Sequence, residues 1–262
     1  MRLYFEIAAQ SARRSLQYRS AYIAGALTNA FFGAIRSFVY IALYGAGGAV
    51  AGLTLSDVIT YTWVTQALIS IGSGWFSSDI AGTIRSGDVV TDLGRPWNFY
   101  GYWFSRSNGE KLFNLITRGS ITYLIGVLYF GVRIPMPGDL LMFAVSAVLA
   151  LVVAFALTFM LNLTAFWLIE VTGVFLMANV LLAFFSGFLI PLAFLLPWMQ
   201  VIANALPFQA ITHLPAQVFL GKLAGPALVA ALLNQVAWSI VLTGCALLAM
   251  RAAVRKVVIQ GG

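Results

Sequence analysis

Charged residues are scarce in this sequence. Asp, Glu, Lys and Arg make up only 9% of the 262 residues, whereas 61% are hydrophobic, and the mean hydropathy is +0.92. A soluble domain averages about 25% charged and about 45–50% apolar residues. So few charges cannot cover a surface that faces water, which excludes a water-soluble globular protein. We therefore expect an all-α integral membrane protein with the bilayer as its solvent.

Residue types that perform catalysis or hold metals are also rare. Cys245 is the only cysteine, so no intrachain disulfide is possible, and His213 is the only histidine. The motifs G-x-x-x-x-G-K-[ST], H-E-x-x-H and G-x-S-x-G do not occur. We therefore expect no catalytic residue, no metal site and no cofactor in this chain. If the protein uses ATP, another chain must bind the ATP and its Mg²⁺.

Long apolar runs, by contrast, are abundant. A membrane-spanning helix needs about 20 mostly apolar residues, and the sequence has room for six such helices. The expected spans are 21–45, 58–78, 112–131, two within the run 140–196 with a break near 170–173, and 226–250. The sequence thus predicts a single transmembrane domain over 1–262 with six transmembrane helices.

Lys and Arg fall mainly on one side of these spans. Only Arg133 and Lys222 lie on the opposite side. The larger group lies before the first span, between the second and third, and after the last: Arg2, Arg13, Arg14, Arg19, Arg85, Arg95, Arg106, Lys111, Arg251, Arg255 and Lys256. Because cytoplasmic loops are enriched in Lys and Arg, we expect both termini to be cytoplasmic.

The segments 1–20 and 190–225 are partly apolar but are not predicted spans. In 1–20, Leu3, Ile7 and Leu16 fall near one face of a helix, with Arg13 and Arg14 elsewhere. This pattern indicates an amphipathic helix in the membrane interface, or alternatively a basic flank that only orients the first span. The segment 190–225 carries four prolines, which interrupt any single helix. We expect it to form short re-entrant helices on the outer side.

Polar and aromatic residues within the spans have two interpretations. Small and polar side chains along one stripe pack membrane helices against each other. Alternatively, such residues line a substrate path, where Phe side chains suit an amphipathic or lipid-like molecule. The candidates for this path are Asn29, Arg36, Gln66, Phe175, Asn179 and Phe184.

Three charged residues lie in or beside the spans. A charged side chain within a span is costly unless it finds a partner or reaches the interface. We expect Arg36 to pair with Asp57 or to snorkel, or alternatively to contact substrate. Arg118 is expected to snorkel to the inner headgroups. Glu170, near the break at 170–173, is expected to cap a helix or to contact a cytoplasmic partner, and a proton-coupling role is the alternative.

The stretch TIRSGDVVTDLGRP, residues 83–96, concentrates charge between the second and third spans. Its charged residues are Arg85, Asp88, Asp92 and Arg95. Val89 and Val90, with Ile84, supply apolar side chains, so the stretch predicts a short amphipathic helix on the cytoplasmic side that ends near Gly94 and Pro96. Such a helix suits docking on a soluble protein, because ion pairs orient a contact and an apolar anchor supplies affinity. The alternative is a solvated loop that only joins two spans.

Three segments resemble a known family: LTLSDVITYTWVTQAL (53–68), TIRSGDVVTDLGRPWNFYGYW (83–103) and SGFLIPLAFLLPWMQVIANALPFQAITHLPAQVFLG (186–221). On these segments, the sequence resembles permease subunits of type-2 ATP-binding-cassette exporters, in the branch with paired paralogous permeases. The resemblance implies a cytoplasmic coupling loop over 79–111 that docks on an ATPase through residues 84–95. It also implies an outer gate over 190–225 and a location in the bacterial inner membrane.

The resemblance further implies what lies outside this chain. Two cassette ATPase subunits and a second permease, identical or paralogous, would complete the complex, with no nucleic acid involved. ATP and Mg²⁺ would bind the ATPase subunits, and the expected cargo is an amphipathic or lipid-like small molecule. An ion-coupled secondary transporter is the alternative function.

Overall fold

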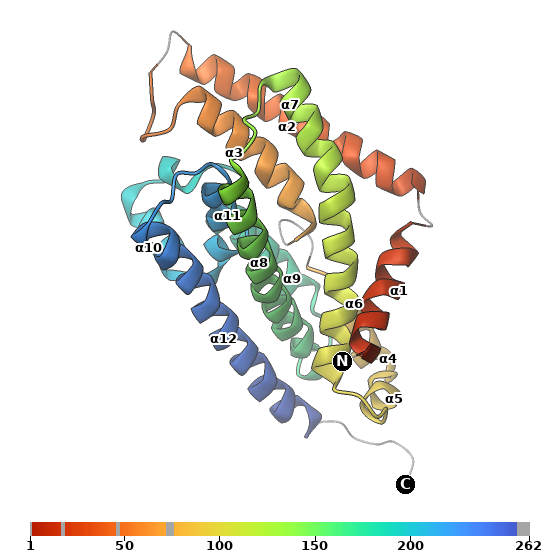
Figure 1. The fold of residues 1–262 in the computed structure, drawn as a ribbon. Helices are drawn as coiled ribbons and strands as arrows, with labels where there is room; N and C mark the ends of the chain where they lie inside the picture. The colour runs from red at the N-terminus through yellow and green to blue at the C-terminus, as the bar shows by residue number, and fades with distance from the viewer. Residues whose placement is uncertain (1, 17–18, 46–47, 72–75, 256–262) are drawn as a thin grey trace.

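Helices make up most of the chain that the structure describes (Figure 1). The computed structural model describes residues 2–16, 19–45, 48–71 and 76–255. The α-helices are α1 (Arg2–Ser15), α2 (Arg19–Tyr44), α3 (Leu55–Ala67), α4 (Asp79–Ser86), α5 (Val89–Leu93), α6 (Phe99–Asn114), α7 (Ser120–Phe130), α8 (Pro137–Leu163), α9 (Thr172–Phe185), α10 (Pro197–Ala205), α11 (His213–Phe219) and α12 (Pro226–Val254). Lys256 and the side chain of Arg19 lie outside the described residues.

Four apolar helices are long enough to cross a bilayer by length and composition. They are Ile23–Tyr44, Phe99–Phe130, Pro137–Phe166 and Pro226–Val254. α3 and α9, in the second and fifth predicted spans, have 13 and 14 residues. Each is therefore about 20 Å long, shorter than the hydrocarbon core of about 30 Å. The all-α membrane class is confirmed, and each of the six predicted spans contains an apolar helix.

The third predicted span begins earlier than its hydropathy indicates. The Asn98 side chain accepts a hydrogen bond from the Gly101 amide at 2.8 Å and caps the start of α6. The helix continues through the π-helical segment η2 (Leu115–Gly119) into α7. It ends at Gly131, whose φ of 63° is left-handed, a conformation that favours glycine. Residues 99–111, expected in the cytoplasmic loop, are therefore helical.

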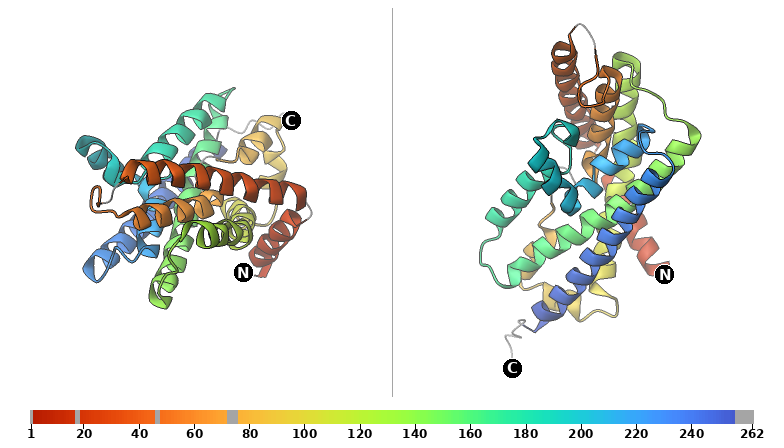
Figure 2. Two further views of the ribbon diagram at one scale, coloured as in Figure 1. Left: turned by 90° about the horizontal axis from the view of Figure 1, so that it is seen from above. Right: turned by 90° about the vertical axis from the view of Figure 1, so that its left-hand side faces the viewer.

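α8 lies at the centre of the bundle, and α12 runs beside it (Figures 1 and 2). Ala147, Ala150 and Ala154 of α8 are buried, and such small side chains let membrane helices approach closely. Buried Gln235 of α12 accepts a hydrogen bond from Ser146 Oγ at 2.8 Å. The pair of helices forms the frame against which the shorter elements pack.

α1 packs directly against α6 (Figure 1). A side chain at Gly109 would overlap the backbone of Ala8, so only glycine permits this approach. The Tyr4 hydroxyl accepts a hydrogen bond from the Asn98 amide at 3.1 Å. The start of α1 and the end of α12 lie at the same end of the molecule as α4 and α5, whereas α10 and α11 lie beside the start of α12 (Figure 1).

Candidate functional site

The start of α4 is held by a side chain from another helix. Asn162 of α8 accepts a hydrogen bond from the Ala81 amide at 2.8 Å and donates one to the Ser77 carbonyl at 2.8 Å. The amides in the first turn of a helix lack partners within the helix. Ser78, at the N-cap position of α4, makes no side-chain capping bond. Asn162 therefore replaces the missing cap and fixes α4 to the C-terminal end of α8.

The apolar side of the α4–α5 segment faces the protein interior. Ile80 and Val89 are buried in a cluster with Phe159, and Ile84 packs against its edge. Val89, expected to anchor a partner, is only 3% exposed, whereas the neighbouring Val90 is 40% exposed. Sequence reasoning could not choose between adjacent valines, because a five-residue helix is too short to show a clear period.

The other side of the segment carries the charged residues expected there. Arg85 and Glu170, just before α9, form an ion pair at 3.0 Å. Asp92 and Arg95 lie 3.9 Å apart, and Asp88 accepts a hydrogen bond from Ser86 Oγ at 2.6 Å. Exposed ion pairs contribute little stability. The exposed Arg85–Glu170 pair therefore adds little to folding, whereas the Asp92 side chain is only 17% exposed.

Glu170 is held in its ionised form at the start of α9. Its Oε1 accepts hydrogen bonds from the Thr172 amide at 2.9 Å and the Thr172 hydroxyl at 2.6 Å. These bonds, together with Arg85, lower the pKa of Glu170 from 4.5 to about 2. The prediction that Glu170 caps a helix is thus confirmed, since Thr172 is the first residue of α9.

Two of the six substrate-path candidates come together. Asn29 and Gln66 are buried, and Asn29 Nδ2 donates to the Gln66 carbonyl at 3.4 Å. Arg118 donates a hydrogen bond to Asn29 Oδ1 at 2.8 Å. The prediction that Arg118 snorkels to the headgroups is therefore wrong, because a polar partner inside the bundle holds its guanidinium. These three residues join α2, α3 and the α6–α7 helix.

Arg36 does not pair with Asp57. Its Nη1 donates a hydrogen bond to the Phe188 carbonyl at 2.8 Å, and its guanidinium lies 4.6 Å from the centre of the Phe188 ring. Asp57 instead forms ion pairs with Arg133 and with Lys222, whose Nζ lies 2.8 Å away. The predicted pair is wrong because two other cations approach Asp57 from the connection after α7 and the segment after α11.

The three candidates on α9 point to different surroundings. Phe175 is buried and lines a small cavity beside α4, whereas Phe184 is 43% exposed. The Asn179 side chain accepts a hydrogen bond from the Phe76 amide at 3.2 Å. Among the described residues, Asn29 and Gln66 thus contact each other, whereas the other four candidates make separate local contacts.

The Pro-rich segment 190–225 and the residues just before it are tied to α3 by polar contacts. The buried Tyr61 hydroxyl donates to the Gly187 carbonyl at 2.8 Å and lies 3.1 Å from Nδ1 of His213. His213 is therefore a structural hydrogen-bonding residue. Asp57 also closes a capping box with Thr54 at the start of α3. These contacts connect the Pro-rich segment to the bundle at several points.

Comparison with known proteins identifies a family. The family described as ABC-2 family transporter protein matches residues 31–261. A search of curated proteins found no match. In the part of the chain that the structure describes, no three His, Cys, Asp or Glu side chains are placed to hold a metal ion. The matched range includes the α4–α5 segment, Asn162 and the outer segment.

Proposed function

This chain belongs to the ABC-2 transporter family, and from this membership we propose that it is the permease subunit of an ATP-driven exporter. A permease of this family works with a cassette ATPase. The proposal adds that ATP is hydrolysed on partner subunits and that an amphipathic or lipid-like small molecule moves outward. The observation that carries it is the α4–α5 segment, which has a charged outer face and a firm attachment to α8.

In this proposal the ATPase docks on the exposed face of α4 and α5. Arg85, Asp88, Asp92 and Arg95 orient the contact, and Val90 supplies its apolar anchor. Because Asn162 bonds α4 to α8, a displacement of α4 moves the inner end of the central helix. The ATPase must bind one conformation of the permease better than another, since a partner that binds both equally shifts nothing.

The proposed complex holds two ATPase subunits and a second permease, identical or paralogous. The chain would lie in the bacterial inner membrane as a multi-pass protein with both termini cytoplasmic. The common location of α4, α5, the start of α1 and the end of α12 supports this orientation. The Asp57 and Tyr61 contacts would then close the outer gate.

An ion-coupled secondary transporter is the second candidate, and Glu170 would be its proton-carrying residue. A pKa of about 2 keeps this carboxylate ionised across the physiological range. A group that stays ionised does not take up and release protons at neutral pH. The state of Glu170 therefore favours the ATP-driven exporter.

The test is affinity purification of the tagged chain from its own membranes in mild detergent, followed by mass spectrometry. The parent is compared with a variant that carries Asp88→Ala, Asp92→Ala and Arg95→Ala. A control variant carries Arg251→Ala and Arg255→Ala, two cations at the same end of the molecule but on α12 and just after it. We expect a cassette ATPase to co-purify with the parent and the control and to be depleted in the triple variant.

An ATPase that stays bound to the triple variant would leave the exporter in place and remove the docking role from these three residues. If no ATPase accompanies the parent while other partners do, the exporter itself is refuted. Transport that follows the proton gradient and is lost in Glu170→Gln would then establish the secondary transporter.

A further inference from the structure

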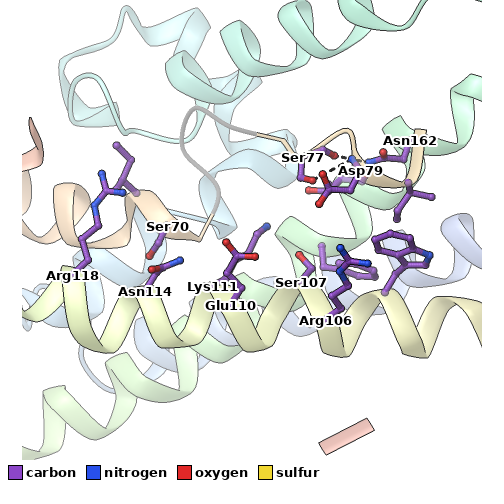
Figure 3. A pocket seen from close by; sticks show the side chains of 15 residues that line it. Ser70, Ser77, Asp79, Arg106, Ser107, Glu110, Lys111, Asn114, Arg118 and Asn162 are labelled. Atoms are coloured by element: carbon purple, nitrogen blue, oxygen red, sulfur yellow. Dashed lines mark hydrogen bonds between the residues drawn. The ribbon is translucent and has the colours of Figure 1, made fainter. Parts of the chain in front are cut away.

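Two separate hollows lie along α8, one towards each end of the helix. Towards the C-terminal end, a polar cavity of about 350 Å³ lies between α4, α6 and α8, and Arg106, Glu110 and Lys111 project into it from α6 (Figure 3). In the N-terminal half, an apolar groove of about 510 Å³ lies between α8 and the α6–α7 helix. From Leu140 in the groove to Asn162 in the cavity, α8 rises about 33 Å, more than the hydrocarbon core of about 30 Å. The two hollows therefore lie in opposite leaflets and are distinct sites.

Small side chains on facing helices leave the space that forms the groove. Gly119 and Ser120 line it from the α6–α7 helix, and Ala144 and Ala147 line it from α8. α8 packs mainly on α12 and α11, whereas α7 packs on α2 and α3. The space between α7 and α8 therefore stays open within the described chain.

The dimensions of the groove select what can occupy it. Along α8 it extends from Leu140 to Leu151, a rise of about 16 Å, which is close to half of the hydrocarbon core at about 15 Å. A volume of about 510 Å³ over that length gives a mean cross-section of about 30 Å². A helix, about 10 Å across, would need about 80 Å². The groove is thus too narrow for a partner helix, and it has the length of one acyl chain in one leaflet.

One end of the groove is bordered by two cations. Arg133 directly precedes Ile134, which lines the groove, and Lys222 follows another lining residue, Phe219, by three positions. The hydroxyl of Tyr123, also a lining residue, donates a hydrogen bond to the Arg133 carbonyl at 2.8 Å. The cations therefore lie at the mouth of the groove, beside the connection between α7 and α8.

The two cations share a single carboxylate. Arg133 and Lys222 both pair with Asp57, yet their side chains remain 48% and 36% exposed. Asp57 is buried and lies on the same face of α3 as Val64, which lines the groove two turns further along the helix. Two cations and one carboxylate leave one positive charge. Because basic pockets between membrane helices bind lipid phosphates, this cluster favours a phosphate at the mouth.

A second carboxylate lies beside this cluster. Asp139, in the first turn of α8, directly precedes the lining residue Leu140, and its side chain faces Gly221, next to Lys222. Among the described residues, no Lys, Arg or His nitrogen lies within 4.0 Å of the Asp139 carboxylate. The mouth therefore offers a positive cluster and, next to it, a carboxylate open to a cationic donor. This arrangement complements a headgroup that carries both charges.

We propose that the groove binds one acyl chain of a phosphatidylethanolamine molecule from the leaflet on the side of the α7–α8 connection. The lipid phosphate lies against Arg133 and Lys222, and its ammonium group donates hydrogen bonds to Asp139. Phosphatidylglycerol has no cation for Asp139, and the choline of phosphatidylcholine has no N–H donor, so both match the mouth less well. The site depends neither on the exported molecule nor on the direction of transport.

The test reconstitutes the full chain, with any subunits that co-purify, in nanodiscs that contain equimolar phosphatidylethanolamine, phosphatidylglycerol and phosphatidylcholine with the same acyl chains. The protein is released into mild detergent, and the retained lipids are counted by native mass spectrometry. We expect the parent to retain phosphatidylethanolamine over both other lipids.

Two charge variants separate the roles of the headgroup contacts. Asp139→Asn should lower the ratio of retained phosphatidylethanolamine to phosphatidylglycerol about fivefold, the factor expected for loss of one exposed ion pair. Lys222→Gln should lower the retention of all three lipids, because each carries a phosphate. The control Glu6→Gln, which removes an exposed carboxylate on α1, should leave both the ratio and the total unchanged.

A second set of variants tests the groove. Ala144→Trp places an indole in the groove, where Ala144 is exposed, and should abolish lipid retention. Val145→Trp, at an adjacent exposed position outside the groove, should retain the lipid. If Ala144→Trp does not elute with the parent on size exclusion, Ile116→Trp fills the groove from the opposite wall.

Three results would overturn the proposal. Equal retention of the three lipids by the parent would mean that the headgroup is not recognised. A preference for phosphatidylglycerol would mean that the cations alone select the lipid. Phosphatidylethanolamine retained equally by the parent and the folded groove variant would mean that the lipid binds elsewhere.

Discussion

Replacing Asn162 with Leu tests how the α4–α5 segment is attached to the bundle. Leu has a similar volume but no polar group, so it removes the cap of α4 while it keeps the packing. The Ala81 amide then loses its acceptor in a region where Ala81 is only 1% exposed. The Ser77 carbonyl loses its donor too, but Ser77 is exposed and water replaces the Asn162 amide.

The free-energy cost of Asn162→Leu comes mainly from the buried Ala81 amide, which loses its hydrogen-bond acceptor. A buried donor left without a partner costs about 1–3 kcal/mol, and loss of a helix cap costs about 1 kcal/mol. We take about 2 kcal/mol, which corresponds to about 30-fold faster local opening. Hydrogen exchange followed by mass spectrometry should therefore show about 30-fold faster exchange over residues 79–86 in the variant.

The matched control is Thr158→Val. Thr158 lies one turn before Asn162 and is also buried, but its hydroxyl donates to the Ala154 carbonyl of its own helix. This control should leave exchange over 79–86 at the parent rate. Unchanged exchange in Asn162→Leu would refute the reasoning, because the attachment of α4 would then rest on the apolar cluster alone.

Three further predictions follow from single contacts. Gly109→Val should release α1 from α6 at a cost of about 1–3 kcal/mol, because the new side chain overlaps the backbone of α1. Protease cleavage within α1 should therefore become faster in this variant. The control Gly173→Ala, whose new methyl group meets no other atom, should leave the cleavage rate unchanged. Asp57→Asn leaves two cations unpaired and should lower the unfolding temperature measured by intrinsic fluorescence, whereas an unchanged value would mean that these ion pairs add no stability. Because its pKa is lowered, the Glu170 carboxylate stabilises the start of α9 at any pH above the usual pKa of 4.5. This stabilisation is lost as the pH falls toward about 2. Hydrogen exchange at the start of α9 should therefore differ between the parent and Glu170→Gln at neutral pH and converge only in strong acid, and convergence already near neutrality would contradict the shift.

The attachment of α4 also bears on how the two ends of the molecule communicate. α8 carries Asn162 near its C-terminal end, and its N-terminal end lies beside α11 and the segment that holds Lys222. Asp139 of α8 faces Gly221, next to Lys222. A rigid displacement of α8 would therefore reach both α4 and the segment that holds Lys222, as coupling between distant sites requires.

Hydropathy by itself determined the membrane class, the order of the six apolar segments and the break near Glu170, because these depend on the local cost of placing polar groups in hydrocarbon. The same reasoning located the charged segment 83–96 and the Pro-rich outer segment. It also identified Glu170 as a capping residue, since its position beside a helix start is visible in the chain order.

The tertiary structure alone decided which polar groups meet. Arg36 and Asp57 are both costly in a membrane, and the sequence offers several opposite charges or carbonyls to each. Only the packing of α3 against the segments after α7 and α11 selects Arg133 and Lys222 for Asp57. The inward direction of Val89, which packs in a cluster with Phe159 of α8, likewise depends on helices far apart in sequence. The local sequence pattern reflects how favourable each residue is in water or in lipid. Which polar groups pair depends instead on distances between helices, and these are fixed only when the bundle assembles.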